Sequence, residues 1–149
     1  MSERVTQWDI GVRWDPNDPD AALIITGAGS AVLAMNPHAD DVNKDCVVLT
    51  WSGVRAASAG PPNDEARAGH PLYRLGLSEI MWAGVVQDSA WIVGLERQNQ
   101  VHPRHDPARF SRLVHYIVPL KENTAEVIAE ASAVLRRPGP TLRAAALSL

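Results

Sequence analysis

Apolar and polar residues alternate in several short segments of this chain, and the alternation predicts β-strands. Trp8, Ile10 and Val12 follow this period within residues 5–14, as one face of a half-buried strand does. Three mainly apolar segments are also expected to form strands: 21–25, 31–35 and 113–120. The pattern therefore favours a protein built mainly from antiparallel strands.

Residues 47–57 give the strongest strand signal. Val47, Leu49 and Trp51 would point to the same side and form the core face, since successive strand side chains point to opposite sides. Pro119 cannot donate a ladder hydrogen bond, and it indicates an edge strand or a strand end.

Turn residues separate these segments. Asp15–Asp20 combines prolines with Asp and Asn, which bond back to the local backbone. Gly27 and Gly29 predict a glycine turn between two strands. They do not form a dinucleotide-binding fingerprint, because the third glycine and the long helix after it are missing.

One segment, 88–99, has a clear helical pattern. Asp88 is expected to cap its first turn, and Trp91 and Leu95 share one face at i, i+4 spacing. Asn99 is expected to end the helix in the left-handed conformation.

Three segments fit more than one structure. Residues 75–86 are expected to begin as a strand and become helical. Residues 125–136 carry a helical stripe of apolar positions, and they also fit the return arm of a hairpin with 113–120. The alanine-rich tail at 138–149 is expected to be flexible or to dock on a neighbouring element.

These elements predict a single globular domain over residues 1–149, α+β in class and mainly antiparallel β. The expected architecture is a curled sheet or small sandwich with one clear helix near 88–99. A length of 149 residues with 46% hydrophobic content suits one domain with one core. Edge strands are often covered by a second copy of the chain, so a homodimer is a reasonable expectation.

The charge composition of the chain bears on which partners it could bind. Charged residues make up 21% of the chain and the formal net charge is −3, so neither sign dominates. This balance predicts no binding to nucleic acid or to an anionic membrane. Met1–Arg4 is polar, no apolar run approaches the roughly 20 residues that cross a bilayer, and a cytoplasmic location is expected. Cys46, the lone cysteine, lies in an apolar run and is expected to be buried and unreactive.

The loop at 60–73 concentrates ionisable residues between glycines and prolines. His70 could act as an acid–base group with Asp64 or Glu65 as its orienting carboxylate, because an imidazole titrates near neutrality. The alternative is that Asn63 and Asp64 cap a turn and His70 fixes the loop through the backbone.

The same loop could form one wall of a ligand pocket. Arg67 would then clamp a carboxylate or an oxyanion. Aromatic side chains could supply the remaining walls, although core packing is the simpler expectation for rings of this size. The predicted binding residues are Asn63, Arg67, Tyr73, Trp51 and Trp82.

Histidine spacing gives only a weak metal signal. His102 and His105 lie three residues apart across a proline, and with His70 or an acid they could form a three-ligand zinc site. The usual H-x-x-x-H or paired C-x-x-C spacing is absent, so we expect no cofactor, with zinc as the alternative. His115 opens an alternating strand and is expected to be hydrogen-bonded there.

Other catalytic motifs are missing. Thr50–Gly53 lacks the first glycine of the G-x-S-x-G elbow, and no glycine pair is followed by Gly-Lys-Ser/Thr. A serine-nucleophile elbow and a phosphate-binding loop are therefore not predicted.

The run Gly-Pro-Pro-Asn-Asp-Glu-Ala…Gly-His-Pro-Leu-Tyr at 60–73, with Asp88–Trp91 and His115–Val118 downstream, resembles a group of small uncharacterised bacterial proteins. The resemblance covers about residues 47–130 and implies no activity. In that group an aromatic-rich hairpin is followed by Thr-Phe-Glu, whereas this chain has Thr124–Glu126 with alanine in the middle. The resemblance implies a strand rather than a helix at that point.

Three functional hypotheses follow from the loop at 60–73. The leading one is a cytoplasmic small-molecule-binding protein with its polar site at this loop. The second is a cofactor-free acid/base enzyme, such as a lyase, isomerase or hydrolase, that uses His70 with Asp64 or Glu65. The third is a homodimeric interaction module without a catalytic site.

Overall fold

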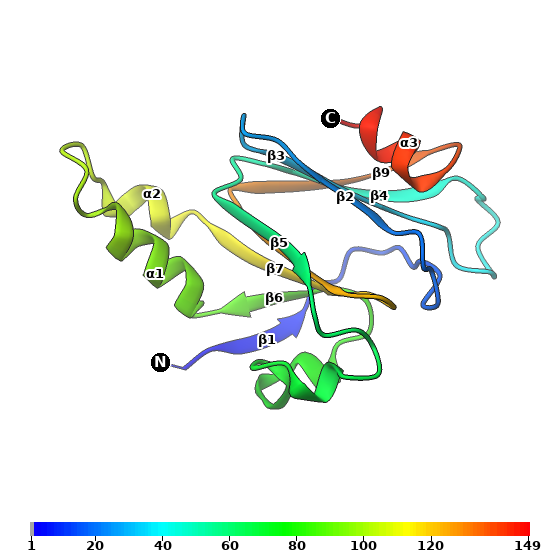
Figure 1. Cartoon of the computed structure of the whole chain (residues 1–149), viewed down its shortest axis with the longest axis horizontal. Helices are drawn as coiled ribbons and strands as arrows, with labels where there is room; N and C mark the ends of the chain where they lie inside the picture. The colour runs from blue at the N-terminus through cyan, green and yellow to red at the C-terminus, as the bar shows by residue number, and fades with distance from the viewer. Residues whose placement is uncertain (1) are drawn as a thin grey trace.

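Two antiparallel sheets contain most of the regular structure in the computed structural model, which describes residues 2–149 (Figure 1). The first has five strands in the order β1-β6-β7-β8-β5: β1 (Arg4–Gln7), β6 (Gly84–Gln87), β7 (Val114–Pro119), β8 (Thr124–Ala129) and β5 (Ala56–Gly60). The second has four in the order β2-β3-β4-β9: β2 (Ala22–Ile25), β3 (Ser30–Met35), β4 (Cys46–Ser52) and β9 (Ala131–Arg137). The predicted α+β class with mainly antiparallel strands is confirmed.

Helical segments lie outside the sheets. The α-helices are α1 (Ala90–Asn99), α2 (Pro107–Ser111) and α3 (Thr141–Ala146). Three short 3-10 turns, η1 (Arg67–Gly69), η2 (Tyr73–Leu75) and η3 (Leu77–Glu79), follow one another in the segment before β6. Within residues 2–149, none of the helices combines the length and apolar character that crossing a bilayer requires.

The main core lies between the two sheets. Leu49 and Trp51 of β4 face Tyr116 and Val118 of β7 in one buried apolar cluster. The predicted core face of β4 is therefore confirmed, and strand alternation explains it. The same alternation sends His115 of β7 to the opposite, outer face of the five-stranded sheet.

That outer face has its own apolar layer, which anchors the segment containing the 3-10 turns. Leu72 and Leu77 are buried against Ile117 and Val86. Gly76 lies between η2 and η3 with φ +111°, and a Cβ there would come within 2.2 Å of the Val5 carbonyl oxygen. Only glycine fits this close approach of two backbones.

Several expectations for local structure are confirmed. The glycine turn joins β2 and β3 as a hairpin, and the helix near 88–99 is α1. Pro119 ends β7, which is an interior strand, so the strand-end interpretation applies. The segment after Thr124 is strand β8, paired with β7. Cys46 is buried, and its thiol contacts the Gly139 carbonyl oxygen.

Other boundaries were predicted wrongly. The strand expected over 5–14 ends at Gln7, and Trp14 forms only an isolated bridge to Pro37. The strand expected over 47–57 is divided between β4 and β5 at Gly53, whose φ of +63° turns the chain. Residues 75–86 run in the reverse of the expected order, with helical turns first and strand β6 last.

The ends of α1 also differ from expectation, whereas the tail follows the alternative in which it docks on a neighbouring element. Ser89, not Asp88, caps α1, while Asp88 has φ +52°. Asn99 is the last helical residue, and the following Gln100 is right-handed, so no left-handed cap forms. The tail at 138–149 forms α3, which covers the outer face of the four-stranded sheet and buries Ala144 and Ala145 (Figure 1). These apolar contacts hold the tail against the sheet, so the flexible alternative does not apply to α3.

Candidate functional site

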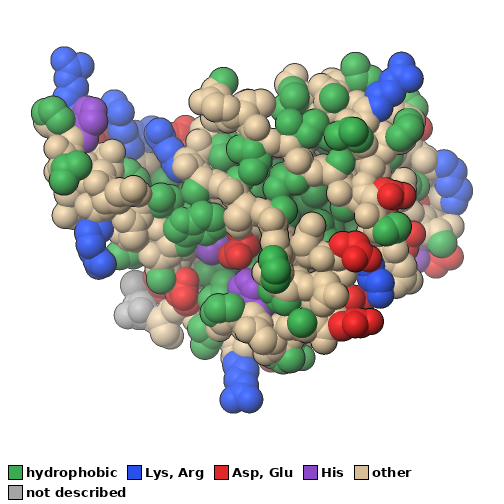
Figure 2. Space-filling model, in the orientation of Figure 1, with side chains coloured by type: hydrophobic (Ala, Val, Ile, Leu, Met, Phe, Trp, Pro, Cys, Tyr) green, Lys and Arg blue, Asp and Glu red, His purple; other side chains and the backbone are tan. Residues whose placement is uncertain are grey.

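A pocket of about 640 Å³ lies on the outer face of the five-stranded sheet, between the 60–73 loop and the start of α1. In Figure 2, acidic and histidine side chains lie together among apolar ones in the lower centre of the view. The lining residues are Glu3, Pro61, Pro62, Ala66, Gly69, His70, Pro71, Leu72, Trp91, His115 and Glu126. They come from four separate regions of the chain, which only the fold brings together.

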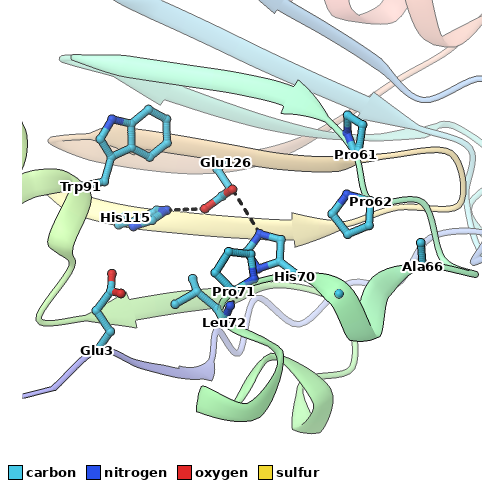
Figure 3. Close-up of a pocket in the computed structure, with 11 residues that line it drawn as sticks. Glu3, Pro61, Pro62, Ala66, His70, Pro71, Leu72, Trp91, His115 and Glu126 are labelled. Carbon is cyan, nitrogen blue, oxygen red and sulfur yellow. Dashed lines mark hydrogen bonds and ion pairs between the residues drawn. The ribbon is translucent and has the colours of Figure 1, made fainter.

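Glu126 is the polar centre of this pocket. Its carboxylate lies between two imidazoles, with His115 Nε2 2.8 Å from Oε1 and His70 Nε2 3.4 Å from Oε2 (Figure 3). His115 and Glu126 are diagonal neighbours on the paired strands β7 and β8, whereas His70 arrives from the loop. Each carboxylate oxygen thus has its own imidazole donor.

The hydrogen bonds of His70 define its protonation. The Leu72 backbone N–H donates to His70 Nδ1 over 3.0 Å, so Nδ1 must be the unprotonated nitrogen. Nε2 then carries the proton that is donated to Glu126. His70 is therefore held as the uncharged Nε2–H tautomer, with both nitrogens occupied.

Ser89 extends the hydrogen-bonded chain beyond His115. Its Oγ lies 2.7 Å from His115 Nδ1 and also accepts the Ile92 N–H as the N-cap of α1. Ser89 is only 4% exposed, so the hydroxyl is enclosed rather than offered to solvent. This side chain fixes the His115 ring and the start of the helix at the same time.

The environment shifts the ionisation of Glu126. Burial raises the pKa of this carboxyl, but the hydrogen bonds that the His115 and His70 imidazoles make to it outweigh burial. The pKa therefore lies below its ordinary value of 4.5. At neutral pH the centre of the pocket is a fixed carboxylate.

Apolar groups form most of the surrounding wall. The Trp91 ring meets His115 edge-on, with centroids 5.4 Å apart and planes at 81°. Leu72 and three prolines line the loop side (Figure 3). Glu3 lies at the strand β1 side, where its Oε1 accepts the Ala90 N–H over 2.7 Å. The result is a hollow with an apolar wall around a localised negative charge.

Of the predicted acid–base residues, only His70 reaches this pocket. The Asp64 carboxylate pairs instead with Lys121 Nζ at 2.8 Å, and this hydrogen bond lowers the Asp64 pKa. Glu65 is exposed. The carboxylate that accompanies His70 is therefore Glu126 rather than Asp64 or Glu65.

The predicted binding residues of the loop have structural partners elsewhere. Asn63 Oδ1 accepts the Ala66 N–H, as the turn-capping alternative proposed. Arg67 donates to the Leu120 carbonyl oxygen and lines a separate, smaller hollow with Asp64. Tyr73 is half-buried in η2.

The predicted aromatic residues are divided among different locations. Trp51 is 3% exposed and packs at 5.8 Å from Tyr116 in the main core. Trp82 packs edge-on against Trp14. Trp91 alone reaches the pocket around Glu126.

The weak zinc candidates do not join His70. His102 and His105 lie in the segment after α1, where His105 Nδ1 contacts the Asn99 amide over 2.9 Å. His102 lines a different hollow from His70. Over residues 2–149 no group of three metal-ligating side chains is placed to hold a metal ion.

Sequence reasoning missed Glu126 and Glu3 as pocket residues, and it missed Ser89 as the hydrogen-bond partner of His115. A signal for Glu126 was present in the hairpin of β7 and β8. Ile117 pairs with Glu126, and Ile117 shares a face with His115, so a polar pair was placed on one sheet face. The helical alternative for residues 125–136 hid this relationship, since a helix there would not pair with the strand at 113–120.

Comparison with known proteins gives no assignment: no family model, curated protein or solved structure matches this chain. Inference about function therefore rests on the pocket itself.

Proposed function

We propose that this protein binds a small organic molecule in the pocket around Glu126. One observation supports the proposal. The partly buried Glu126 carboxylate, held by two imidazole donors, lies at the centre of a hollow whose wall is mostly apolar. Ligand pockets typically combine apolar walls with a few placed polar groups, and about 640 Å³ lies within their usual range of roughly 300–1,000 Å³.

The polar centre is organised before a ligand arrives. Glu126 is oriented by His115, which is oriented by Ser89, and His70 is fixed by the Leu72 backbone. A carboxylate that is already oriented loses little conformational freedom on binding, which favours affinity.

The same contacts favour binding over the acid/base alternative. A carboxylate whose pKa is lowered is a weak proton acceptor at neutral pH. Both nitrogens of His70 are engaged, and the Ser89 hydroxyl is enclosed and caps α1. No group around the pocket is thus poised as a strong base or nucleophile.

A fragment screen by ligand-observed NMR tests the proposal. Small organic fragments that bind the wild-type protein should lose binding in Ala66→Trp, since Ala66 lines the pocket and an indole there would occupy it. The matched control is Ala68→Trp, two residues later in η1, exposed and outside the lining. This control should keep wild-type binding.

Two results would reject the proposal. One is the absence of any binding fragment for the folded wild-type protein. The other is equal binding by Ala66→Trp and Ala68→Trp, which would place any bound fragment outside the pocket around Glu126.

A further inference from the structure

Among residues 2–149, the permanently charged side chains that line the pocket are of one sign. Glu3 and Glu126 line it, and none of the lining residues in this described range is a lysine or arginine. Lys121 and Arg67, the basic side chains nearest in the loop region, are engaged with Asp64 and the Leu120 carbonyl in a separate hollow. An anionic ligand would therefore meet carboxylates without a counter-charge.

The histidines do not reverse this sign. His70 is uncharged, because its Nδ1 accepts the Leu72 N–H. His115 can satisfy Ser89 either as a neutral ring or as a cation. With two carboxylates and at most one imidazolium, the pocket is negative whichever form His115 takes.

The pocket wall favours apolar and aromatic groups on the ligand, in addition to the preference for positive charge. The faces and edges of the Trp91 ring, with Leu72 and the loop prolines, offer apolar and aromatic contact. A cation close to an indole face gains attraction from the ring electrons, and an apolar substituent gains from leaving water. An inorganic cation would use only the charge.

We infer that the ligand of this pocket is an organic cation, an ammonium or amidinium group that carries an apolar or aromatic substituent. This inference rests on the proposed binding function. The cationic head donates hydrogen bonds to the Glu126 carboxylate, and the substituent lies against Trp91 and Leu72. Glu3 lines the pocket at the β1 side and adds to the negative potential there (Figure 3).

A matched set of three fragments tests the inference: 2-phenylethylamine, 2-phenylethanol and 3-phenylpropanoate. The fragments are similar in shape and differ in charge at the head. Dissociation constants for the wild-type protein are measured at pH 7 by protein-observed NMR. The amine should bind about tenfold more tightly than the alcohol, because a charge-assisted hydrogen bond is stronger than a neutral one. The carboxylate should bind more weakly than both.

Two variants test whether Glu126 is the residue that causes the preference for the amine over the alcohol. Glu126→Gln keeps the shape of the side chain and removes its charge, so the amine and the alcohol should bind with similar affinity. Glu122→Gln removes an exposed carboxylate on the β7–β8 turn, outside the pocket lining, and should keep the tenfold preference. The comparison of the three fragments on the wild-type protein does not depend on either variant folding.

The outcomes separate the inference from the proposed function. Equal binding of the amine and the alcohol, or tighter binding of the carboxylate, with loss of binding in Ala66→Trp, would overturn the cation inference and leave the pocket function standing. No binding by any of the three overturns the inference, and the wider fragment screen then decides the proposed function.

Discussion

His70 Nε2 lies 3.4 Å from Glu126 Oε2, and this contact joins the 60–73 loop to strand β8 across 56 positions of sequence. The His70 side chain is only 7% exposed. Because its other nitrogen accepts the Leu72 N–H, one imidazole closes the loop on itself and fastens it to the sheet. This imidazole is therefore one of the contacts that hold the loop wall of the pocket in place, beside the packing of Leu72.

His70→Ala should therefore lower the free energy of unfolding by about 1–3 kcal/mol, the usual cost of leaving buried hydrogen-bond partners unsatisfied. Urea denaturation measures the change. His102→Ala is the control, since His102 is exposed and should change stability by less than about 0.5 kcal/mol. Equal effects of the two substitutions would show that the contact with Glu126 does not stabilise the fold.

Low pH should reduce the free energy of unfolding, because Glu126 becomes protonated. The folded-state pKa is lowered below 4.5, so the stabilisation is fully present above the unfolded value and is lost as pH falls through the folded value. Glu126→Gln carries no such titration. The difference in unfolding free energy between wild type and Glu126→Gln should be largest at pH 7 and shrink below about pH 4.5. Urea denaturation from pH 7 to pH 3 measures it, and a constant difference would contradict the assignment.

Capping of α1 distinguishes two neighbouring residues. Ser89→Ala removes the bond from Ile92 N–H and the partner of His115, and should cost about 1–2 kcal/mol. Asp88→Asn should cost less than about 0.5 kcal/mol, because asparagine tolerates the left-handed backbone at φ +52°. Thermal and urea unfolding of the two variants measure this. A loss for Ser89→Ala no larger than that for Asp88→Asn would contradict the role of Ser89 as the cap.

Gly76→Ala tests the close approach that seats the 3-10 segment behind the pocket. A Cβ would lie 2.2 Å from the Val5 carbonyl oxygen, at φ +111°, so we expect a loss of about 2–4 kcal/mol from displacement and strain. Gly94→Ala, in the open on α1, should instead gain up to about 1 kcal/mol. If both substitutions stabilise the protein in urea denaturation, the two backbones do not meet as described.

Metal removal should leave the protein unchanged. Both Nε2 atoms that face Glu126 are occupied by hydrogen bonds to its carboxylate, and residues 2–149 hold no group of three ligands placed for a metal ion. Dialysis against EDTA should shift the melting temperature by less than about 1 °C, since only a bound ligand adds stability. One equivalent of zinc in the purified protein by elemental analysis, with a fall in melting temperature on its removal, would contradict this expectation.

Sequence patterns correctly predicted those features that depend on neighbouring residues in the chain. Alternation identified the core face of β4, because a residue's position in a strand dictates its side. Helical spacing identified α1, and the glycines between β2 and β3 identified their turn. The ends of elements were less predictable, since Ser89 and Asp88 are both good caps in sequence and the bond to His115 selects Ser89.

Only part of the pocket around Glu126 could be predicted from such sequence patterns. The 60–73 loop, which the sequence singled out, supplies several lining residues of the pocket, and His70 is one of them. Its partner was expected among Asp64 and Glu65, the nearest carboxylates in sequence. Asp64 instead faces Lys121, and Glu126 faces His70.

Sequence by itself therefore determined the location of several strands, the apolar face of β4, and the loop that carries the ionisable residues. Tertiary structure alone decided which of those ionisable residues meet. The physical reason is that strand faces follow from a two-residue period within a segment, whereas the contact of His70, Glu126 and His115 follows from the pairing of β7 with β8 and the packing of Leu72 against Ile117. Such pairings join positions far apart in the chain and leave no local pattern.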